Sequence, residues 1–328
     1  MTAQASSHIG PAPRRSGIGK PLIFLGVIAL GIVAPFVGVY PILLMKLLCF
    51  ALFACAFNLL IGFVGLLSFG HAMFFGSAAY ATGHAIKVWG FTPELGILFG
   101  VLAAALLGLL VGLLAIRRQG IYFAMITMAL AQMFYFFALQ VPFTGGEDGL
   151  QGVPRGALFG VLPLGNDLTL YYVVLAVVVA SWLLIARIVH SPFGQILKAI
   201  RENEPRTISL GYDSDRFKLV AFILSAALAG LAGALKCLVL GFATLSDVHW
   251  ATSGSVILMS LIGGIGTLSG PVVGAFIITG LENVLADRVG PWVTVILGVI
   301  FVVSVLLFRK GLVGTLRELL FKDRTKAA

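Results

Sequence analysis

The amino-acid sequence predicts an all-α polytopic membrane protein with about 8–10 transmembrane helices, some of them broken or re-entrant. Its 328 residues are 59% hydrophobic and only 11% charged, with a mean hydropathy of +1.06, whereas about a quarter of the residues of a soluble protein are charged. A second observation is the glycine-rich run 263–271, which ends at Pro271 inside an apolar stretch. Because lipid cannot hydrogen-bond to exposed backbone, such a run requires surrounding protein or a water-filled cavity. A transport pathway is therefore predicted rather than a simple membrane anchor.

The segments expected to span the membrane form one domain, residues 21–308. They are 21–39, 42–64, 69–86, 94–116, 120–140, 169–189, 217–240, 252–265, 270–286 and 291–308. A disordered arm, 1–20, is expected before them and a basic tail, 309–328, after them. Ten crossings place both termini on one side, and eight or nine remain possible if 69–86 or 252–270 only dips into the membrane.

Positive charge is unevenly distributed along the chain. The formal net charge is +9, and 17 of the 22 Lys and Arg residues fall on the side that holds both termini. These residues are Arg14, Arg15, Lys20, Arg117, Arg118, those within 187–218 and those from Arg309 onward. The positive-inside rule makes this side, and both termini, cytoplasmic. The basic surface is therefore expected to face anionic lipid or a cytoplasmic partner rather than nucleic acid.

Motifs for catalysis or cofactor binding are absent from the sequence. It contains no GxxxxGK[ST] phosphate-binding loop, no GxSxG nucleophile elbow and no HExxH zinc pattern. Cys49, Cys55 and Cys237 lie in apolar segments without CxxC spacing, so buried free thiols are expected. We expect no enzyme activity, no metal and no cofactor in this chain.

The predicted inner loop, 190–216, is the most charged stretch of the protein. Ser191 and Pro192 predict a helix start, because Ser can cap the first turn and Pro at the first position loses no hydrogen bond. Asn203 interrupts this helix, and a second one is expected to end near Gly211. Two short surface helices are predicted, with a solvated connector as the alternative. The apolar positions that recur at helical spacing are Phe193, Ile196, Leu197 and Ile200.

The predicted outer loop, 141–168, contains the sequence TGGEDGL at 144–150. Its glycines and acidic residues are typical of tight turns. A docking surface for an external partner is the alternative interpretation.

Two glycine-rich segments, 62–71 and 263–274, are expected at membrane depth. In the first, Ser68 and His71 add polar groups where the backbone is expected to bend, although a lone His is more often hydrogen-bonded structure than a ligand. In the second, Gly266, Gly270 and Gly274 recur every four residues, which predicts a packing seam on one helix face. The alternative is a broken helix whose free amides face a small polar substrate.

Lys236 and Glu282 are the ionisable residues expected at appreciable membrane depth. An intramembrane charge is a functional candidate, but two isolated charges without a proton-relay chain give little support to ion coupling. For Lys236 we expect the side chain to snorkel to an interface.

Five short motifs occur in a fixed order along the chain. They are GLLSFGH at 65–71, RQGIYFA at 118–124, TGGEDGL at 144–150, SPFG at 191–194 with AIRENE at 199–204, and GGIGTLSGP at 263–271. In this order they resemble the inner-membrane permeases of branched-chain amino acid ABC importers, the LivM type. The resemblance covers roughly residues 42–308.

The resemblance implies a multi-pass protein of the bacterial inner membrane, working with two ABC ATPases that use ATP, a second permease and a periplasmic substrate-binding protein. The second permease is a sister chain or an identical copy. The segment 191–211 is implied to be the coupling helix that docks into an ATPase groove. The Glu-Ala-Ala signature usual in such a helix does not occur here. Of that pattern, residues 204–211 keep only Glu204 and, seven residues later, Gly211.

The resemblance also implies three groups of site residues. For ATPase coupling they are Glu202, Glu204, Arg206 and Gly211. For the translocation path they are Ser68, His71, Gly263, Gly264, Gly266 and Thr267. For docking of the binding protein they are Thr144, Gly145, Glu147 and Asp148.

The implied substrate is a branched-chain amino acid or a related small polar solute, such as another amino acid, urea or a short amide. Two other classes stay open from the sequence. An ion-coupled secondary transporter would lose uptake with a protonophore and ignore ATP. A passive channel would show facilitated flux without nucleotide.

Overall fold

The computed structural model describes residues 31–37, 40–307 and 311, and the chain divides into two units, 1–39 and 40–328. In the first unit the described residues include the short 3-10 helix η1 (Ala34–Val37). The predicted arm 1–20, most of the predicted span 21–39 and all of the tail 309–328 except Gly311 lie outside the described residues. All other elements named below belong to the second unit.

The second unit is built almost entirely from helices, as the predicted all-α class requires. Its α-helices are α2 (Pro41–Phe63), α3 (His71–Lys87), α4 (Pro93–Ala115), α5 (Ile121–Gln140), α6 (Asp167–His190), α7 (Pro192–Glu202), α8 (Glu204–Ser209), α9 (Ser214–Leu240), α10 (Trp250–Gly263), α11 (Gly270–Val289) and α12 (Val293–Leu307). The short elements are the 3-10 helices η2 (Pro142–Thr144), η3 (Gly146–Asp148), η4 (Leu245–Asp247) and η5 (Gly290–Trp292), and the antiparallel hairpin of β1 (Ala157–Leu158) and β2 (Leu162–Pro163).

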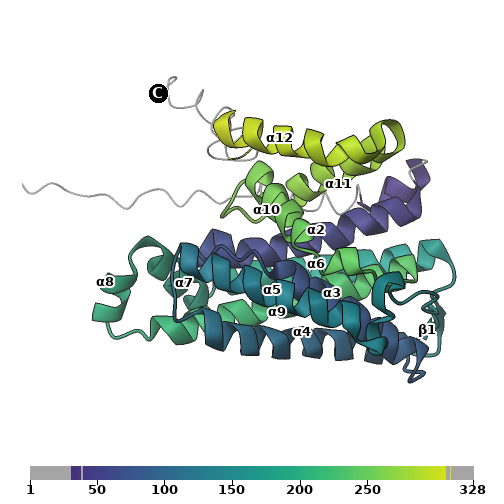
Figure 1. Cartoon of the computed structure of the whole chain (residues 1–328), viewed down its shortest axis with the longest axis horizontal. Coiled ribbons are helices and arrows are strands. Elements are labelled where there is room, and N and C mark those ends of the chain that lie inside the picture. The colour runs from purple at the N-terminus through teal and green to yellow at the C-terminus, as the bar shows by residue number, and fades with distance from the viewer. Residues whose placement is uncertain (1–30, 38–39, 308–310, 312–328) are drawn as a thin grey trace, which may run out of the picture. The chain divides into compact units, whose positions relative to one another are not determined.

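The long helices lie side by side, so this unit has two ends (Figure 1). We call the end with α7 and α8 the α8 end, and the opposite end, with the hairpin, the β1 end. Helices α2 and α9 are buried along most of their length and form the centre, and α3 packs against both α9 and α4.

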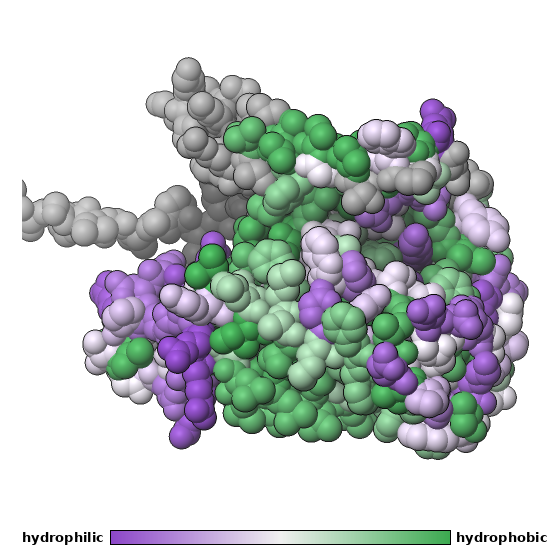
Figure 2. Space-filling view, viewed as in Figure 1, coloured by the Kyte–Doolittle hydropathy of each residue, from purple (hydrophilic) through white to green (hydrophobic). Residues whose placement is uncertain are grey.

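Five of the described helices, α2, α4, α5, α6 and α9, are long and apolar enough to cross a membrane. The exposed side chains of α4 are all leucines, and most of them form a regular stripe: Leu95, Leu98, Leu102, Leu106, Leu110 and Leu113, with Leu114 beside it. Figure 2 shows hydrophilic residues gathered at the α8 end, next to a hydrophobic surface over α4. This distribution suits a bilayer that surrounds the long helices, and it confirms the predicted polytopic membrane class.

The backbone is broken at both glycine-rich segments, as expected. Residues 64–70 are non-helical, so the predicted span 69–86 begins only at His71 with α3. Residues 264–269 form the turn between α10 and α11, where Gly264 and Gly266 have φ values of 114° and 78°. Only glycine adopts such angles at low cost. The predicted seam is therefore wrong in one respect: Gly266 precedes α11, and only Gly270 and Gly274 belong to that helix.

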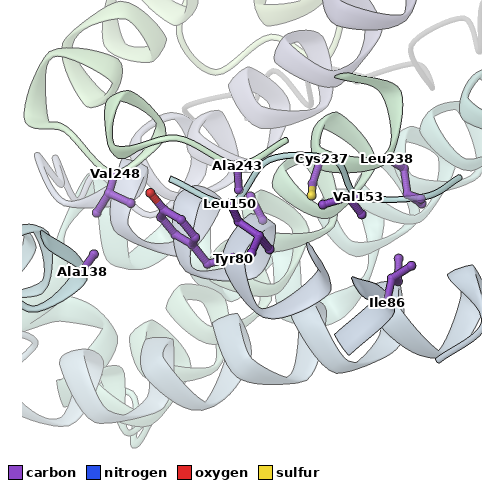
Figure 3. Packing of buried hydrophobic residues seen from close by; sticks show 10 residues of the cluster. Tyr80, Ile86, Ala138, Leu150, Val153, Cys237, Leu238, Ala243 and Val248 are labelled. Atoms are coloured by element: carbon purple, nitrogen blue, oxygen red, sulfur yellow. The ribbon is translucent and has the colours of Figure 1, made fainter. Parts of the chain in front are cut away.

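The β1 end is closed by a buried apolar cluster that joins distant parts of the chain. Figure 3 shows Tyr80 and Ile86 of α3 beside Leu150, Val153 and Val248 from the connecting loops. The loop after η3 is also held by backbone hydrogen bonds, in both directions between Leu150 and Ala243 at 2.9 Å. Cys237 belongs to this cluster, and all three cysteines are buried free thiols, as predicted.

Lys236 does not snorkel, contrary to our expectation. Its side chain is 7% exposed and forms an ion pair with Asp247 of η4, whose side chain is 5% exposed. The second carboxylate oxygen of Asp247 accepts hydrogen bonds from the backbone and hydroxyl of Thr244. Because Asp247 follows α9 by only a few residues, pairing satisfies the ammonium group locally, and no route to the interface is needed.

Close contact between α3 and α9 depends on glycine. At Gly233 of α9 an added Cβ would overlap the carbonyl oxygen of Phe75, whereas at Gly280 of α11 nothing lies within 4 Å of that position. Small residues of this kind let two membrane helices approach closely.

We predict opposite outcomes for the same substitution at these two glycines. Gly233→Ala should destabilise the protein by about 1–3 kcal/mol, the usual cost of overpacking, because backbone must move. Gly280→Ala should be neutral or stabilise it by up to about 1 kcal/mol, through helix propensity. Equilibrium unfolding in mixed detergent micelles measures both, and equal stability of the two variants would contradict the packing described.

Candidate coupling and translocation site

Helices α7 and α8 form a folded unit on the bundle, as predicted for 190–216. The Ser191 hydroxyl caps α7 by accepting from the backbone N–H of Gly194 at 3.3 Å, and Asn203 Oδ1 caps α8 by accepting from that of Arg206 at 3.1 Å. Leu197 and Ile200 of α7 are buried. The alternative of a solvated connector is therefore wrong for this segment.

Glu204 binds α8 to two other parts of the chain. One of its carboxylate oxygens accepts from Gln119 Nε2 in the α4–α5 turn at 2.9 Å. The other accepts from the Ser214 hydroxyl at 2.8 Å and pairs with the Lys218 ammonium group, both in α9. The Lys218 side chain is 2% exposed, so the carboxylate is committed to its own chain.

The other predicted coupling residues face outward. Glu202, Arg206 and Gly211 are exposed, and Gly211, the second residue after α8, has a φ of 91°. This left-handed residue ends the helix near the predicted position. Three of the four predicted coupling residues are therefore available to a partner, and Glu204 instead holds α8 in place.

The end of α7 meets both broken segments at the α8 end. Arg201 donates a hydrogen bond to the carbonyl oxygen of Gly62, in the last turn of α2. A Cβ added at Gly65 would lie 3.1 Å from Arg201 Cγ, and one added at Gly266 would lie 3.1 Å from Arg201 Nη1. One side chain therefore contacts α2, the 64–70 segment and the α10–α11 turn.

Asn58 of α2 joins that turn to the bundle with both ends of its amide group. Nδ2 donates to the carbonyl oxygen of Thr267 at 2.8 Å, and Oδ1 accepts from the backbone N–H of Gly266 at 3.0 Å. Asn58 is only 2% exposed. The predicted path residues Gly263, Gly264, Gly266 and Thr267 therefore lie together at the α8 end.

Ser68 and His71 are fully buried, farther along the bundle. His71 Nε2 lies 2.8 Å from the hydroxyl of Ser225, which itself donates to the carbonyl oxygen of Ala56 at 2.6 Å, so the imidazole is the donor in the first bond. The imidazole is enclosed edge-on by Phe57, Phe74 and Phe222. In this conformation His71 is a hydrogen-bonded residue of the buried core.

Several amides at the two broken segments are satisfied by side chains of the protein in this conformation. At the start of α3, the N–H groups of Phe69, Gly70 and Ala72 donate to the hydroxyls of Thr127, Ser68 and Ser253 respectively. At the start of α11, the N–H of Gly270 donates to the Thr267 hydroxyl at 3.0 Å. Side chains occupy the positions that a bound anion would otherwise take.

A hollow of about 410 Å³ opens beside the 64–70 segment. It is lined by Gly65, Leu66, Leu67, Phe69, Gly120, Ile121 and Ala124. It adjoins an exposed face of α5 that differs from the leucine stripe of α4. The members of this α5 face are Tyr122, Met125, Met128, Met133, Phe136 and Phe137.

The predicted docking residues lie at the β1 end. Gly145, Glu147 and Asp148 are exposed, but Thr144 is buried and donates to the carbonyl oxygens of Ala138 and Val141. The loop is anchored rather than mobile, because Leu150 bonds to Ala243. Arg155 adds a second anchor by pairing with Asp167 at 2.6 Å.

Four residues of this site escaped the sequence analysis: Asn58, Gln119, Arg201 and Lys218. Asn58 could have been noticed, since it is the one side-chain amide in the largely apolar segment 42–64, where Lys46 is the one charged residue. Gln119 and Arg201 lie in the motifs at 118–124 and 199–204 but were given no role there, and Lys218 was counted only among the basic residues of 187–218. Among the described residues, no group of three or more His, Cys, Asp or Glu side chains could hold a metal ion.

A family model described as "Branched-chain amino acid transport system / permease component" matches residues 39–305. The match covers α2 to α11 and most of α12. The chain belongs to this family. Its members are permease subunits of ABC transporters and are not enzymes themselves.

Individual relatives agree with this assignment. The high-affinity branched-chain amino acid transport system permease protein LivM of Escherichia coli (strain K12) is 27% identical over 308 residues, which cover 84% of this chain and 71% of the relative. LivM of Salmonella typhimurium is 26% identical, over 88% and 75% of the two chains. The autoinducer 2 import system permease protein LsrC of Klebsiella pneumoniae is 31% identical, over 57% and 53%. No solved structure matches the chain.

The permease is thus a multi-pass protein of the inner membrane and a subunit of an ABC importer. Because it belongs to the permease component, ATPase and substrate-binding partners are implied.

We predict that Glu204 stabilises the permease through Lys218. Glu204→Gln leaves the buried ammonium group without a counter-charge and should lower the free energy of unfolding by about 3 kcal/mol. The double variant Glu204→Gln/Lys218→Met removes the uncompensated charge and should recover most of that loss. Unfolding in mixed detergent micelles measures both, and a double variant no more stable than Glu204→Gln alone would contradict the pairing.

Proposed function

We propose that this permease carries a branched-chain amino acid, or a closely related small polar solute, into the cytoplasm. The observation that carries the proposal is the extent of the match: the LivM relatives align over 84% and 88% of this chain, whereas an LsrC relative aligns over 57%. The LivM proteins are named for the transport of branched-chain amino acids. The relatives thus favour an amino acid over autoinducer 2.

In the proposed arrangement the α8 end faces the cytoplasm, and α7–α8 dock on partner ATPases. The support is the concentration of Lys and Arg in 187–218 together with the positive-inside rule. Glu202, Arg206 and Gly211 present an exposed surface for that contact, and Glu204 anchors α8 to the bundle behind it. Closure of two ATPases on ATP would then move a rigid unit and shift the bundle between inward-open and outward-open states.

The path is proposed to run along the α5 face and the adjoining hollow, against a second permease. Non-helical backbone at membrane depth is tolerated only where protein or water covers it, and Gly65 in the 64–70 segment is exposed beside the hollow. Met and aromatic side chains on α5 are also typical of adaptable protein contacts. Ser68, His71 and the 263–267 turn would border this path once the bundle moves.

The binding protein is proposed to dock at the β1 end. Gly145, Glu147 and Asp148 are exposed there on a loop whose base is held by hydrogen bonds and an ion pair. A fixed loop loses little conformational entropy when a partner docks.

Solute-stimulated ATP hydrolysis tests the function directly. We predict that the permease, purified with its partner subunits and binding protein in proteoliposomes, hydrolyses ATP faster with leucine, isoleucine or valine than with autoinducer 2. The measurement is phosphate release with each solute in turn. Stimulation by autoinducer 2 alone would overturn the substrate, and uptake that needs no ATP but collapses with a protonophore would overturn the mechanism.

Cross-linking tests the proposed permease contact. Met133→Cys on the α5 face should form a cross-link to the second permease in membranes, because the two faces pack together. Leu106→Cys on the leucine stripe of α4 should not, because that stripe faces lipid. The three native cysteines are buried, so they give little background. Equal cross-linking of the two variants would contradict the assignment.

A further inference from the structure

We infer that Arg201 and Asn58 form the mechanical link through which α7 moves the two broken backbone segments. The inference rests on the proposed function, in which α7 and α8 receive the movement of the ATPases. It concerns how that movement enters the membrane part of the chain. Both are positioning residues, since neither needs to touch the transported solute.

The first step of the link is the bond from Arg201 to α2. The carbonyl oxygen of Gly62 belongs to the last turn of α2, where carbonyl groups lack partners within the helix. The guanidinium group of Arg201 donates to it, and a positive charge at a helix C-terminus is also favourable electrostatically. A displacement of the α7 end therefore pulls on the end of α2.

The second step is the packing of the Arg201 stem on glycine. Its Cγ would lie 3.1 Å from a Cβ at Gly65, and its Nη1 the same distance from one at Gly266. Both glycines have positive φ values, 85° and 78°, so the backbone turns sharply where the arginine touches it. Interfaces packed this closely transmit small displacements rather than absorb them.

The third step is the attachment of the α10–α11 turn to the end of α2. Asn58 binds both the N–H of Gly266 and the carbonyl of Thr267 from within α2. A Cβ added at Gly62 would lie 2.7 Å from the Gly266 nitrogen, so the turn rests directly on α2. Because Asn58 lies one turn before Gly62, the end of α2 and the α10–α11 turn move together.

Exposure separates this role from simple docking of the ATPase. Arg201 is exposed and could contact a partner, but Asn58 is 2% exposed and cannot. If a substitution at Arg201 and one at Asn58 impair transport in the same way, the impairment arises inside the permease and not at its contact with the ATPase. Glu202, the neighbour of Arg201, belongs to the proposed docking surface. A substitution at Glu202 therefore serves as the reference for a variant that has lost docking of the ATPase.

The experiment measures ATP hydrolysed per leucine imported in proteoliposomes containing the whole importer. Arg201→Met keeps the aliphatic stem and removes the donor, and Asn58→Asp keeps the acceptor and removes the donor to Thr267. Each should raise the ratio of ATP to leucine about tenfold, the effect of losing one hydrogen bond to a charged or buried group. Arg201→Lys, which still offers a donor, should recover part of the coupling.

Two further measurements exclude folding and docking defects. The amount of ATPase that copurifies with each variant should equal wild type, whereas Glu202→Ala is expected to reduce it. The double variant Arg201→Met/Asn58→Asp should have the same ratio of ATP to leucine as either single variant, because the two residues act in one chain of contacts. Arg118→Met, an exposed arginine in the α4–α5 turn, serves as the matched control and should leave the ratio unchanged.

Unchanged ATP-to-leucine ratios in both single variants would overturn the inference while the wild-type importer still works. Loss of copurifying ATPase from Arg201→Met with a normal Asn58→Asp variant would also overturn it, in favour of docking. Failure of the proposed function looks different, because the wild-type complex itself would then show no leucine-stimulated ATP hydrolysis.

Discussion

The structure depends on one constraint: inside a bilayer, every backbone polar group must find its partner within the protein. Most of the chain meets this requirement with long helices. The segments 64–70 and 264–269 are not helical, and there side chains supply hydrogen-bond partners that a helix would otherwise provide. Thr127, Ser68 and Ser253 accept from the amides at the start of α3, and Asn58 satisfies both a donor and an acceptor of the second turn.

This arrangement explains why the broken segments are ordered and also why they are suited to move. A helix resists bending because each of its hydrogen bonds supports the next, whereas a turn held by two or three side chains can exchange those partners at modest cost. At the α8 end both turns lie against Arg201 of α7. The first turn leads into α3 and His71, and the second leads into α11. The bundle can thus be rigid in its helices and adjustable at its breaks.

Each end of the permease contains a buried lysine that is paired with a carboxylate. Lys218 and Lys236 are buried in α9, one near each end, and each has a carboxylate partner on a short neighbouring element, Glu204 of α8 and Asp247 of η4. A buried pair of this kind fixes an element in one place, because separating the charges in a dry environment is costly.

The sequence by itself determined the membrane class, the two short helices after α6, the cap at Ser191, the interruption at Asn203, the buried cysteines and the position of the broken backbone. These features follow from composition and from contacts within a few residues. Only the tertiary structure decided that Glu204 faces inward, that Lys236 is paired, that Gly266 lies outside α11, and that Asn58 and Arg201 meet the same turn. Their partners lie up to 209 positions away along the chain, and local patterns contain no information about contacts that only the packing of distant helices creates.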